Sequence, residues 1–292
     1  FKYLDDYDKS EFVGKFSTEQ LKCESLQYFN SDYYKTSIIK TFTDIKYIED
    51  GIKLLKEDWN KLEIIKLVSE DKDKVSLLQY IESESYKVNV ICELKDDSFK
   101  IDFIDSIKDS TNIAKVISSF VDDNTKLDYI DRIQYEWDKV SIVSSITDED
   151  ILSRGLSLFK EERYKANVLV ELKDDRLKVK FLSIIEDDSS KVRIIKSIKE
   201  DLVKVEVLTL INDEKAKVDI INSLKDEHIR LSLVPNLENN ENKFLVIAAI
   251  TSKELKNNAL KSIDNYKEVM NTFFEKGNFE YLYHFEKDIL RE

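Results

Sequence analysis

Hydrophobic and polar residues recur along the chain with a period of thirteen residues. Rows of thirteen counted from Lys9 continue without insertion or deletion for twenty rows and end at Glu268. Row position 1 is Lys or Arg in seventeen rows, positions 5 and 8 are apolar in all twenty, and position 11 is Asp or Glu in fifteen. A period of this kind is typical of stacked supersecondary units.

Each row predicts one short amphipathic helix. The apolar residues at positions 2, 4, 5 and 8 have the i, i+3, i+4 spacing of a single helix face. Positions 9 to 12 collect Lys, Asp, Asn, Ser and Glu, which are residues of turns and helix N-caps. A helix of about nine or ten residues is unstable alone, so we expect packing against its neighbours to hold it.

A second period of 26 residues underlies the first. Position 13 is mostly apolar in one set of rows and mostly polar or small in the other, and position 7 alternates between large residues such as Tyr28 and small ones such as Ser119. The structural unit is therefore a pair of unlike antiparallel helices. We name the helix after an apolar position 13 the A helix, and its small-faced partner the B helix.

We predict an all-α fold, a right-handed α-solenoid of about ten 26-residue helix pairs. A solenoid buries its core as a continuous ribbon, so we expect one elongated domain with atypical ends. The predicted limits are 1–292 for the domain, 1–8 for an N-terminal cap, 9–268 for the repeats and 269–292 for a C-terminal cap.

With these repeats the chain resembles the HEAT/armadillo class of α-solenoids over about residues 9–268. The resemblance is one of architecture, because the 26-residue pair is shorter than a typical HEAT or armadillo repeat. The chain also lacks a proline-marked kink in each first helix, since its single proline is Pro235. The resemblance implies that a partner binds along an extended surface.

Three residues interrupt the pattern. Gly51 and Gly155 occupy position 4 of two A helices, where other rows carry a core side chain. We expect segment 148–159, around Gly155, to be an irregular point in the stack, either a bend or a closer helix approach. Pro235 at position 6 of an A helix predicts that the helix ends or kinks near Leu233.

Aromatic residues gather at both ends of the chain. Residues 1–8, with Phe1, Tyr3 and Leu4, are expected to cover the first hairpin. The first three rows predict either an enlarged core or a recognition surface built from tyrosine, through Tyr28, Phe29, Tyr33, Tyr34, Phe42 and Tyr47. Near the C-terminus, Gly277 predicts a helix stop, followed by a final helix over 278–290. Its aromatic residues are expected to cap the solenoid, or to form an oligomer contact.

Position 1 forms a column of basic residues. On a helical wheel it lies between positions 5 and 8, and its three exceptions are aliphatic: Ile48, Ile113 and Leu152. We therefore predict that the lysine stems pack on the apolar face while the ammonium groups reach out at the helix ends. There they would pair with the acid four residues earlier, as in Asp96–Lys100, Asp174–Lys178 and Asp187–Lys191. The alternative is a ladder that follows a phosphate backbone.

Composition narrows the classes of partner. The net charge of −13 disfavours a general nucleic-acid binder and favours a basic protein partner. No apolar run approaches a membrane span, so we expect no membrane partner. The two cysteines form no disulfide framework, which predicts a reducing intracellular compartment, the cytoplasm.

Two sets of exposed positions are candidate partner sites. Positions 3 and 6 point away from the core, and on consecutive A helices they carry Asp102, Asp105, Asp128 and Asp131. This patch would receive an Arg/Lys-rich partner or weakly hold a divalent cation, against the alternative of a solvated acidic face. Position 12 carries a tryptophan in two rows, expected at the turn from A to B, where it would anchor a partner or pack beneath the turn: Trp59 and Trp137.

The B helices carry a third candidate surface, made of small residues. We expect close helix approach there, or a shallow groove for a partner helix or peptide, along Ser118, Ser119, Ser144, Ser145, Ser197, Ser223, Ala248 and Ala249.

Catalytic chemistry finds little support. The two histidines, His228 and His284, lie far apart, and no phosphate loop, nucleophile elbow or paired Cys/His spacing occurs. We expect no cofactor, no metal and no enzyme, but a protein-interaction scaffold or adaptor. The alternatives are an assembly protein that self-associates through its ends or edges, and a nucleic-acid-binding solenoid with a basic band at Arg176, Lys178, Lys180, Arg193 and Lys196.

Overall fold

The structure is a computed structural model that describes residues 3–277, and every regular element in that range is helical. The α-helices are α1 Asp6–Gly14, α2 Glu19–Ser25, α3 Asp32–Ile39, α4 Ile45–Ile52, α5 Asp58–Leu67, α6 Asp71–Leu77, α7 Glu84–Ile91, α8 Asp97–Ile104, α9 Ser110–Ser118, α10 Asp123–Asp128, α11 Glu136–Ser144, α12 Glu149–Ser157, α13 Glu162–Glu171, α14 Asp175–Phe181, α15 Asp188–Ser197, α16 Asp201–Glu206, α17 Glu214–Asn222, α18 Glu227–Leu233, α19 Asn240–Ala248, α20 Lys253–Leu260 and α21 Tyr266–Glu275. Short 3₁₀ helices follow six of them: η1 Leu26–Tyr28, η2 Leu78–Tyr80, η3 Ile130–Arg132, η4 Leu182–Ile184, η5 Leu208–Leu210 and η6 Val234–Asn236.

The helices follow the thirteen-residue rows without a slip. Each α-helix from α1 to α21 begins at row position 11, so positions 11, 12 and 1 are its first, second and fourth residues. Position 5 is buried in all twenty rows, from Val13 to Leu260. The predicted all-α solenoid is therefore confirmed, with the even-numbered helices as the A helices and the odd-numbered helices as the B helices.

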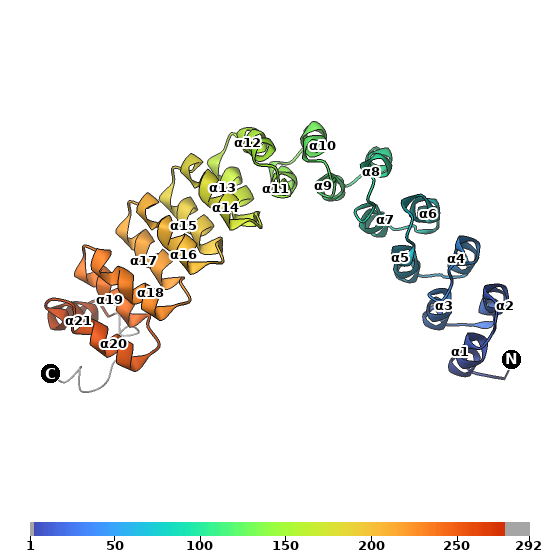
Figure 1. Cartoon of the computed structure of the whole chain (residues 1–292), viewed down its shortest axis with the longest axis horizontal. Coiled ribbons are helices and arrows are strands. Elements are labelled where there is room, and N and C mark those ends of the chain that lie inside the picture. The colour runs from blue at the N-terminus through green and yellow to red at the C-terminus, as the bar shows by residue number, and fades with distance from the viewer. Residues whose placement is uncertain (1–2, 278–292) are drawn as a thin grey trace. The chain divides into compact units, whose positions relative to one another are not determined.

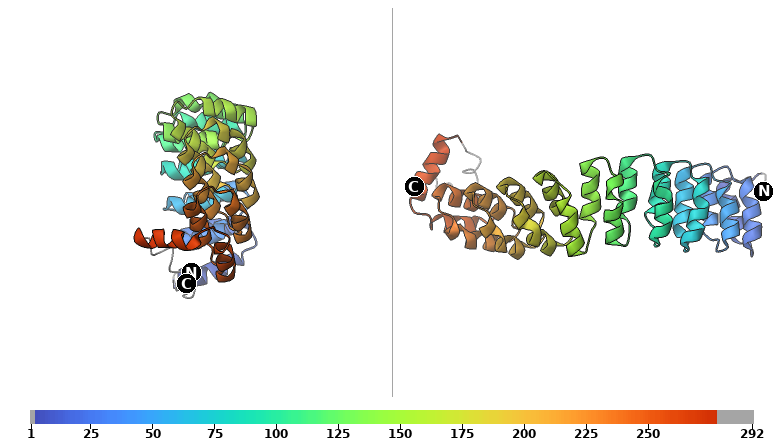
Figure 2. Two further views of the ribbon diagram at one scale, coloured as in Figure 1. Left: turned by 90° about the vertical axis from the view of Figure 1, so that its left-hand side faces the viewer. Right: turned by 90° about the horizontal axis from the view of Figure 1, so that it is seen from above.

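The helices form two layers. Within each of the two units defined below, odd-numbered helices lie in one layer and even-numbered helices in the other (Figure 1), and consecutive helices stand side by side (Figure 2). Contacts divide the chain into two compact units, Phe1–Gly155 (unit 1) and Leu156–Glu292 (unit 2). Within each unit the odd helices pack more closely on one another than the even helices do. The single domain over 1–292 stays a prediction.

Both interior glycines mark close helix contacts. A Cβ on Gly51 would lie 2.8 Å from Cγ1 of Ile39, and one on Gly155 would lie 2.9 Å from Cγ1 of Val143. Glycine therefore lets α4 approach α3, and α12 approach α11. The division between the two units also falls at Gly155, inside the segment expected to be irregular.

Pro235 lies where the sequence placed a helix break. Helix α18 ends at Leu233, and the proline occupies the start of η6. The same change from α to 3₁₀ occurs without proline after α2, α6, α10, α14 and α16. Other A helices also change from α to 3₁₀ at this point, so the break does not require proline. Pro235 fits there because it lies in the first residues of η6, where a helix needs no backbone N–H donor.

The aromatic ends differ from expectation. Tyr3 and Leu4 are exposed, so the prediction that they cover the first hairpin is wrong, and Phe1 lies outside the described residues. In the early rows Phe29 and Phe42 are core residues, whereas Tyr28 and Tyr33 are exposed, so each interpretation holds for part of the set.

At the other end, Gly277 has the predicted left-handed backbone, with φ of 75°. Helix α21 packs on α19, where the Phe273 ring lies 4.7 Å from that of Phe244. The predicted helix over 278–290, with Phe279, Tyr281, Tyr283 and Phe285, lies outside the described residues.

Candidate partner-binding surfaces

Nine lysines of the column are buried, and its other basic residues are half-buried. Lys100 is 1% exposed, and its Nζ lies 3.1 Å from Oδ1 of Asp97 while it donates to the carbonyl oxygen of Ser119. Lys126 repeats the arrangement, with Nζ 2.7 Å from Oδ1 of Asp123 and 2.9 Å from the carbonyl oxygen of Ser145. The prediction of a core-facing column is confirmed. The prediction that the ammonium reaches out at the helix end is wrong for these lysines, because protein oxygens enclose it.

The acid that pairs with each lysine is three residues earlier, not four. Lys178 pairs with Asp175 at 3.4 Å, and Lys191 pairs with Asp188 at 3.2 Å. The residues expected as partners cap their own helices instead: Asp96 accepts from the Ser98 backbone N–H, Asp174 from that of Arg176, and Asp187 from that of Ser190. Position 10 is therefore an N-cap position, and position 11 supplies the ion pair.

The position-11 carboxylate also caps a helix of the next repeat. Oδ2 of Asp123 accepts from the backbone N–H of Thr147 and of Asp148, both at 2.9 Å. These two residues directly precede α12, the next helix of the same layer. The same contact, 24 and 25 residues on, occurs in both layers, with Asp6, Glu19, Asp32, Asp58, Asp71, Glu84, Asp97, Glu162, Asp188, Asp201, Glu214 and Glu227 as acceptors.

These contacts lower the pKa of several of the carboxylates. Burial by itself raises the pKa of Asp123, but hydrogen bonds from Lys126, Asp148 and Thr147 outweigh it and hold the pKa below the ordinary 3.8. The same balance lowers the pKa of Asp6, Asp32 and Asp58. Burial lowers the pKa of Lys204, which donates to the Ser223 carbonyl. The lysines and carboxylates thus form an internal lattice, and the buried lysines offer no ladder to a phosphate backbone.

The small residues of the B helices make room for the lysine heads. The carbonyls of Ser119, Ser145, Ser197 and Ser223 receive the ammonium groups from the preceding A helices. Their hydroxyls bond back to their own helices, as Ser197 Oγ does to the Ile194 carbonyl. These serines are half-buried, so much of the expected smooth surface belongs to the internal lattice.

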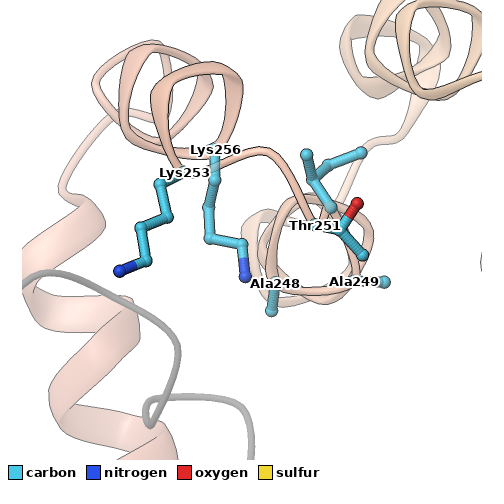
Figure 3. Close-up of a pocket in the computed structure, with 6 residues that line it drawn as sticks. Ala248, Ala249, Thr251, Lys253 and Lys256 are labelled. Carbon is cyan, nitrogen blue, oxygen red and sulfur yellow. The ribbon is translucent and has the colours of Figure 1, made fainter.

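A pocket of about 330 Å³ opens at the last part of the small-residue surface, in unit 2. Ala248, the last residue of α19, and Ala249, which follows it, form one wall, and Lys253 and Lys256 extend from α20 beside them (Figure 3). Burial lowers the pKa of Lys256. The position that usually carries an acid is Lys253 here, so this end of the lattice is locally basic.

The acidic patch is exposed as predicted. Asp102 lies in α8 and Asp105 directly follows that helix, while Asp128 lies in α10 and Asp131 in η3, and all four are exposed. Arg132 forms an ion pair with Asp105 and lies 5.2 Å from the centre of the Tyr129 ring. Across residues 3–277, no group of three or more Asp, Glu, His or Cys side chains is placed to hold a metal ion.

Both tryptophans lie on the surface, on the second residue of a B helix. Trp59 in α5 is 54% exposed and Trp137 in α11 is 55% exposed, with the Trp137 ring stacked on Tyr135 at 5.7 Å. The prediction that they pack beneath a turn is wrong. Tyr7 in α1 and Tyr33 in α3 hold the same helix position and are exposed as well. Tyr7, Tyr33 and Trp59 are spaced by 26 residues, so the sequence already indicated that they share one helix position, although only the tryptophans were predicted as sites.

The thiols give no sign of catalytic chemistry. Cys23 and Cys92 are both free. Burial raises the pKa of each, whereas a reactive thiol has a lowered pKa.

No helix in residues 3–277 combines the length and the apolar character needed to cross a membrane. No protein-family model matches the chain, and no curated protein matches it. A solved chain from work on the computational design of self-assembling cyclic protein homooligomers aligns with 93% of this chain and 91% of its own length, at 12% identity and a TM-score of 0.10. That TM-score is too low to support a common fold. The assignment of the architecture therefore rests on the sequence repeat and on the helices of this structure.

Proposed function

We propose that this chain is a non-catalytic scaffold that binds a basic protein partner through the acidic patch of unit 1. The observation that carries the proposal is the contrast between two kinds of carboxylate. Most carboxylates at position 11 accept backbone hydrogen bonds inside the protein, as Asp123 does, whereas Asp102, Asp128 and Asp131 are exposed and add their negative charge to that of Asp105. A concentrated exposed charge of one sign attracts and orients an oppositely charged partner.

The proposed scaffold works in a reducing intracellular compartment, the cytoplasm. Two free cysteines and the absence of a membrane-crossing helix among residues 3–277 are compatible with that setting. Nucleic acid is a poor ligand for it, because Lys178 of the basic band is buried and the chain carries a net charge of −13.

Affinity capture with two baits of equal charge tests the proposal. One bait changes Asp102, Asp105, Asp128 and Asp131 to Asn. The matched control changes four exposed glutamates of unit 2 to Gln: Glu186, Glu206, Glu238 and Glu254. We expect a salt-sensitive basic partner, captured by the wild type and the control, to be lost by the first bait.

Retention of that partner by both baits would contradict the acidic patch as the binding site. Recovery of the bait alone, with concentration-dependent sedimentation of the purified protein, would instead support self-association.

A further inference from the structure

Three exposed aromatic residues form a regular column on unit 1. Tyr7, Tyr33 and Trp59 are each the second residue of their helix, in α1, α3 and α5. They are 59%, 72% and 54% exposed. Helix α3 packs directly on α1 and on α5, in the layer seen in Figure 1. Since packed helices lie about 8–10 Å apart, the three rings recur at about that interval. We call this set the aromatic column.

The fold does not need aromatic side chains at this position. The first-turn contacts of these helices are made by the neighbouring residue, as Asp32 accepts from the backbone N–H of Lys56 and of Glu57. In α7 and α9 the same position is Ser85 and Thr111. Adjacent exposed aromatic residues that packing does not require are typical of an interaction surface.

The interval between the rings matches one type of peptide backbone. A polyproline II helix has three residues per turn and rises about 3.1 Å per residue, so it repeats every ~9.3 Å. Residues i, i+3 and i+6 of such a helix would meet the three rings in turn. An extended strand turns residue i+3 to its other face. An α-helix reaches a similar advance only at i+7, and its backbone carbonyls are already bonded within the helix.

The polar atoms and charges of the column fit the same ligand. A polyproline II backbone makes no internal hydrogen bonds, so its carbonyls can accept from the tyrosine hydroxyls and the tryptophan Nε1–H. Four exposed carboxylates lie close in sequence to the residues of the column: Asp5, Asp8, Glu11 and Glu57. One exposed lysine, Lys56, lies beside Glu57. This charge favours a peptide that carries Arg or Lys beside its prolines.

We propose that the aromatic column binds a proline-rich, basic peptide segment in the polyproline II conformation, with every third residue on one ring. The surface lies on the odd-helix layer, whereas the acidic patch projects from the even-helix layer, so the inference goes beyond the scaffold function and either site can fail without the other.

Trp137 supplies a matched control. It has the same helix position as Trp59 and nearly the same exposure, 55%. Ser85 and Thr111 separate it from the column. A single ring without neighbours at the 26-residue spacing cannot contact successive turns of one peptide. Truncation of Trp137 therefore removes equal aromatic surface without breaking the column.

Fluorescence anisotropy with the full chain tests the proposal. The probe is a labelled oligoproline of about ten residues with Arg at both ends, which spans ~30 Å. We expect Tyr33→Ala and Trp59→Ala to weaken binding of this probe at least tenfold, and Trp137→Ala to change it less than twofold. We also expect Ser85→Tyr, which extends the column by one ring, to tighten binding of a longer probe. Helical circular dichroism checks that each variant is folded.

Three results would overturn the proposal. The first is equal loss for Trp59→Ala and Trp137→Ala. The second is equal affinity for a control peptide in which glycine and serine replace the prolines between the same arginines, since charge alone would then explain binding. The third is self-association of the wild type that Trp59→Ala abolishes, which would make a second copy of this chain the occupant.

Discussion

Units 1 and 2 repeat the same internal contacts but differ at one surface position. In both units the first residue of a helix holds a lysine and caps a neighbouring helix, as Asp32 does in α3 and Asp188 in α15. The second residue of the odd helices is aromatic in α1, α3, α5 and α11 of unit 1. In unit 2 it is Arg163, Ser189, Lys215, Glu241 and Lys267.

This comparison distinguishes a position whose residue type is fixed by internal contacts, position 11, from one that packing leaves unconstrained, position 12. Six of the first-residue carboxylates are bound from two sides, by a lysine and by backbone donors of the next repeat: Asp6, Asp32, Asp58, Asp97, Asp123 and Asp188. A side chain at position 12 points to solvent, so its identity changes without cost to the fold. Two of the three aliphatic residues of the lysine column follow a non-acidic position 11, which indicates that the lysine and the acid form one unit: Ile45 with Ile48, and Ser110 with Ile113.

Acid gives the largest expected effect on the internal contacts. The capping carboxylates have pKa values lowered from 3.8 for Asp123 and from 4.5 for Glu227. A lowered folded-state pKa contributes stability that is present above the unfolded value and lost as pH falls through the folded value. We expect a melting temperature that is flat down to about pH 4.5 and then falls in both units. A main transition near neutral pH would contradict this assignment.

Removal of one buried acid is the next largest change. Asp123→Ala leaves the Lys126 ammonium without its carboxylate, and Thr147 and Asp148 without their shared acceptor. We expect the opening free energy of α10–α12 amides to drop by about 3–5 kcal/mol in native-state hydrogen exchange. Asp128→Ala, on the exposed face of the same helix, should change it by less than about 0.5 kcal/mol. Similar losses for both variants would refute the distinction between internal and surface carboxylates.

Two lysines of unit 2 allow a buried ion pair to be compared with a partly exposed one. Met keeps most of the lysine stem but removes the ammonium. Lys178→Met removes the ammonium from the Ser197 carbonyl and from Oδ1 of Asp175, whose Oδ2 still accepts from the Lys199 backbone N–H, so we expect a loss of about 1–3 kcal/mol in urea unfolding. Lys191→Met breaks a more exposed pair and should cost less than about 1 kcal/mol. An unchanged unfolding midpoint for Lys178→Met would show that the buried ammonium is dispensable.

An exchange at position 12 should have the smallest effect on stability. Trp59→Arg and Arg163→Trp exchange the residues of the two units at an exposed site. We expect each variant to unfold within about 0.5 kcal/mol of the wild type by urea titration. A loss of more than about 2 kcal/mol for Trp59→Arg would mean that the ring is part of the packing, which would also remove the case for a binding column.

Most of the fold could be predicted from the periodic sequence pattern because the packing contacts between helices recur with the same thirteen-residue period. Apolar positions 5 and 8 gave the helices and their register, and Pro235 gave the end of α18. The wheel also placed the four aspartates of the acidic patch on the surface. These predictions depend on local geometry and on which face of a helix meets its neighbours.

The missed contacts depend on groups far away in sequence. Positions i−3 and i−4 both neighbour a lysine on a helix, and the choice between Asp96 and Asp97 as partner of Lys100 follows from where the amides of Val121 and Asp122 lie. Arg132, the last residue of the 3₁₀ helix η3, reaches Asp105, which lies 27 residues earlier in the chain.

The cap that most acidic first residues make 24 and 25 residues downstream has a consequence for how the gene can change length. Deletion of 26 residues within a unit brings each carboxylate to an equivalent pair of amides, as if Glu162 met the donors that now serve Asp188. Deletion of thirteen would instead join unlike helices. Duplication and loss of whole helix pairs are therefore the changes of length that preserve the hydrogen bonds between these carboxylates and the next repeat.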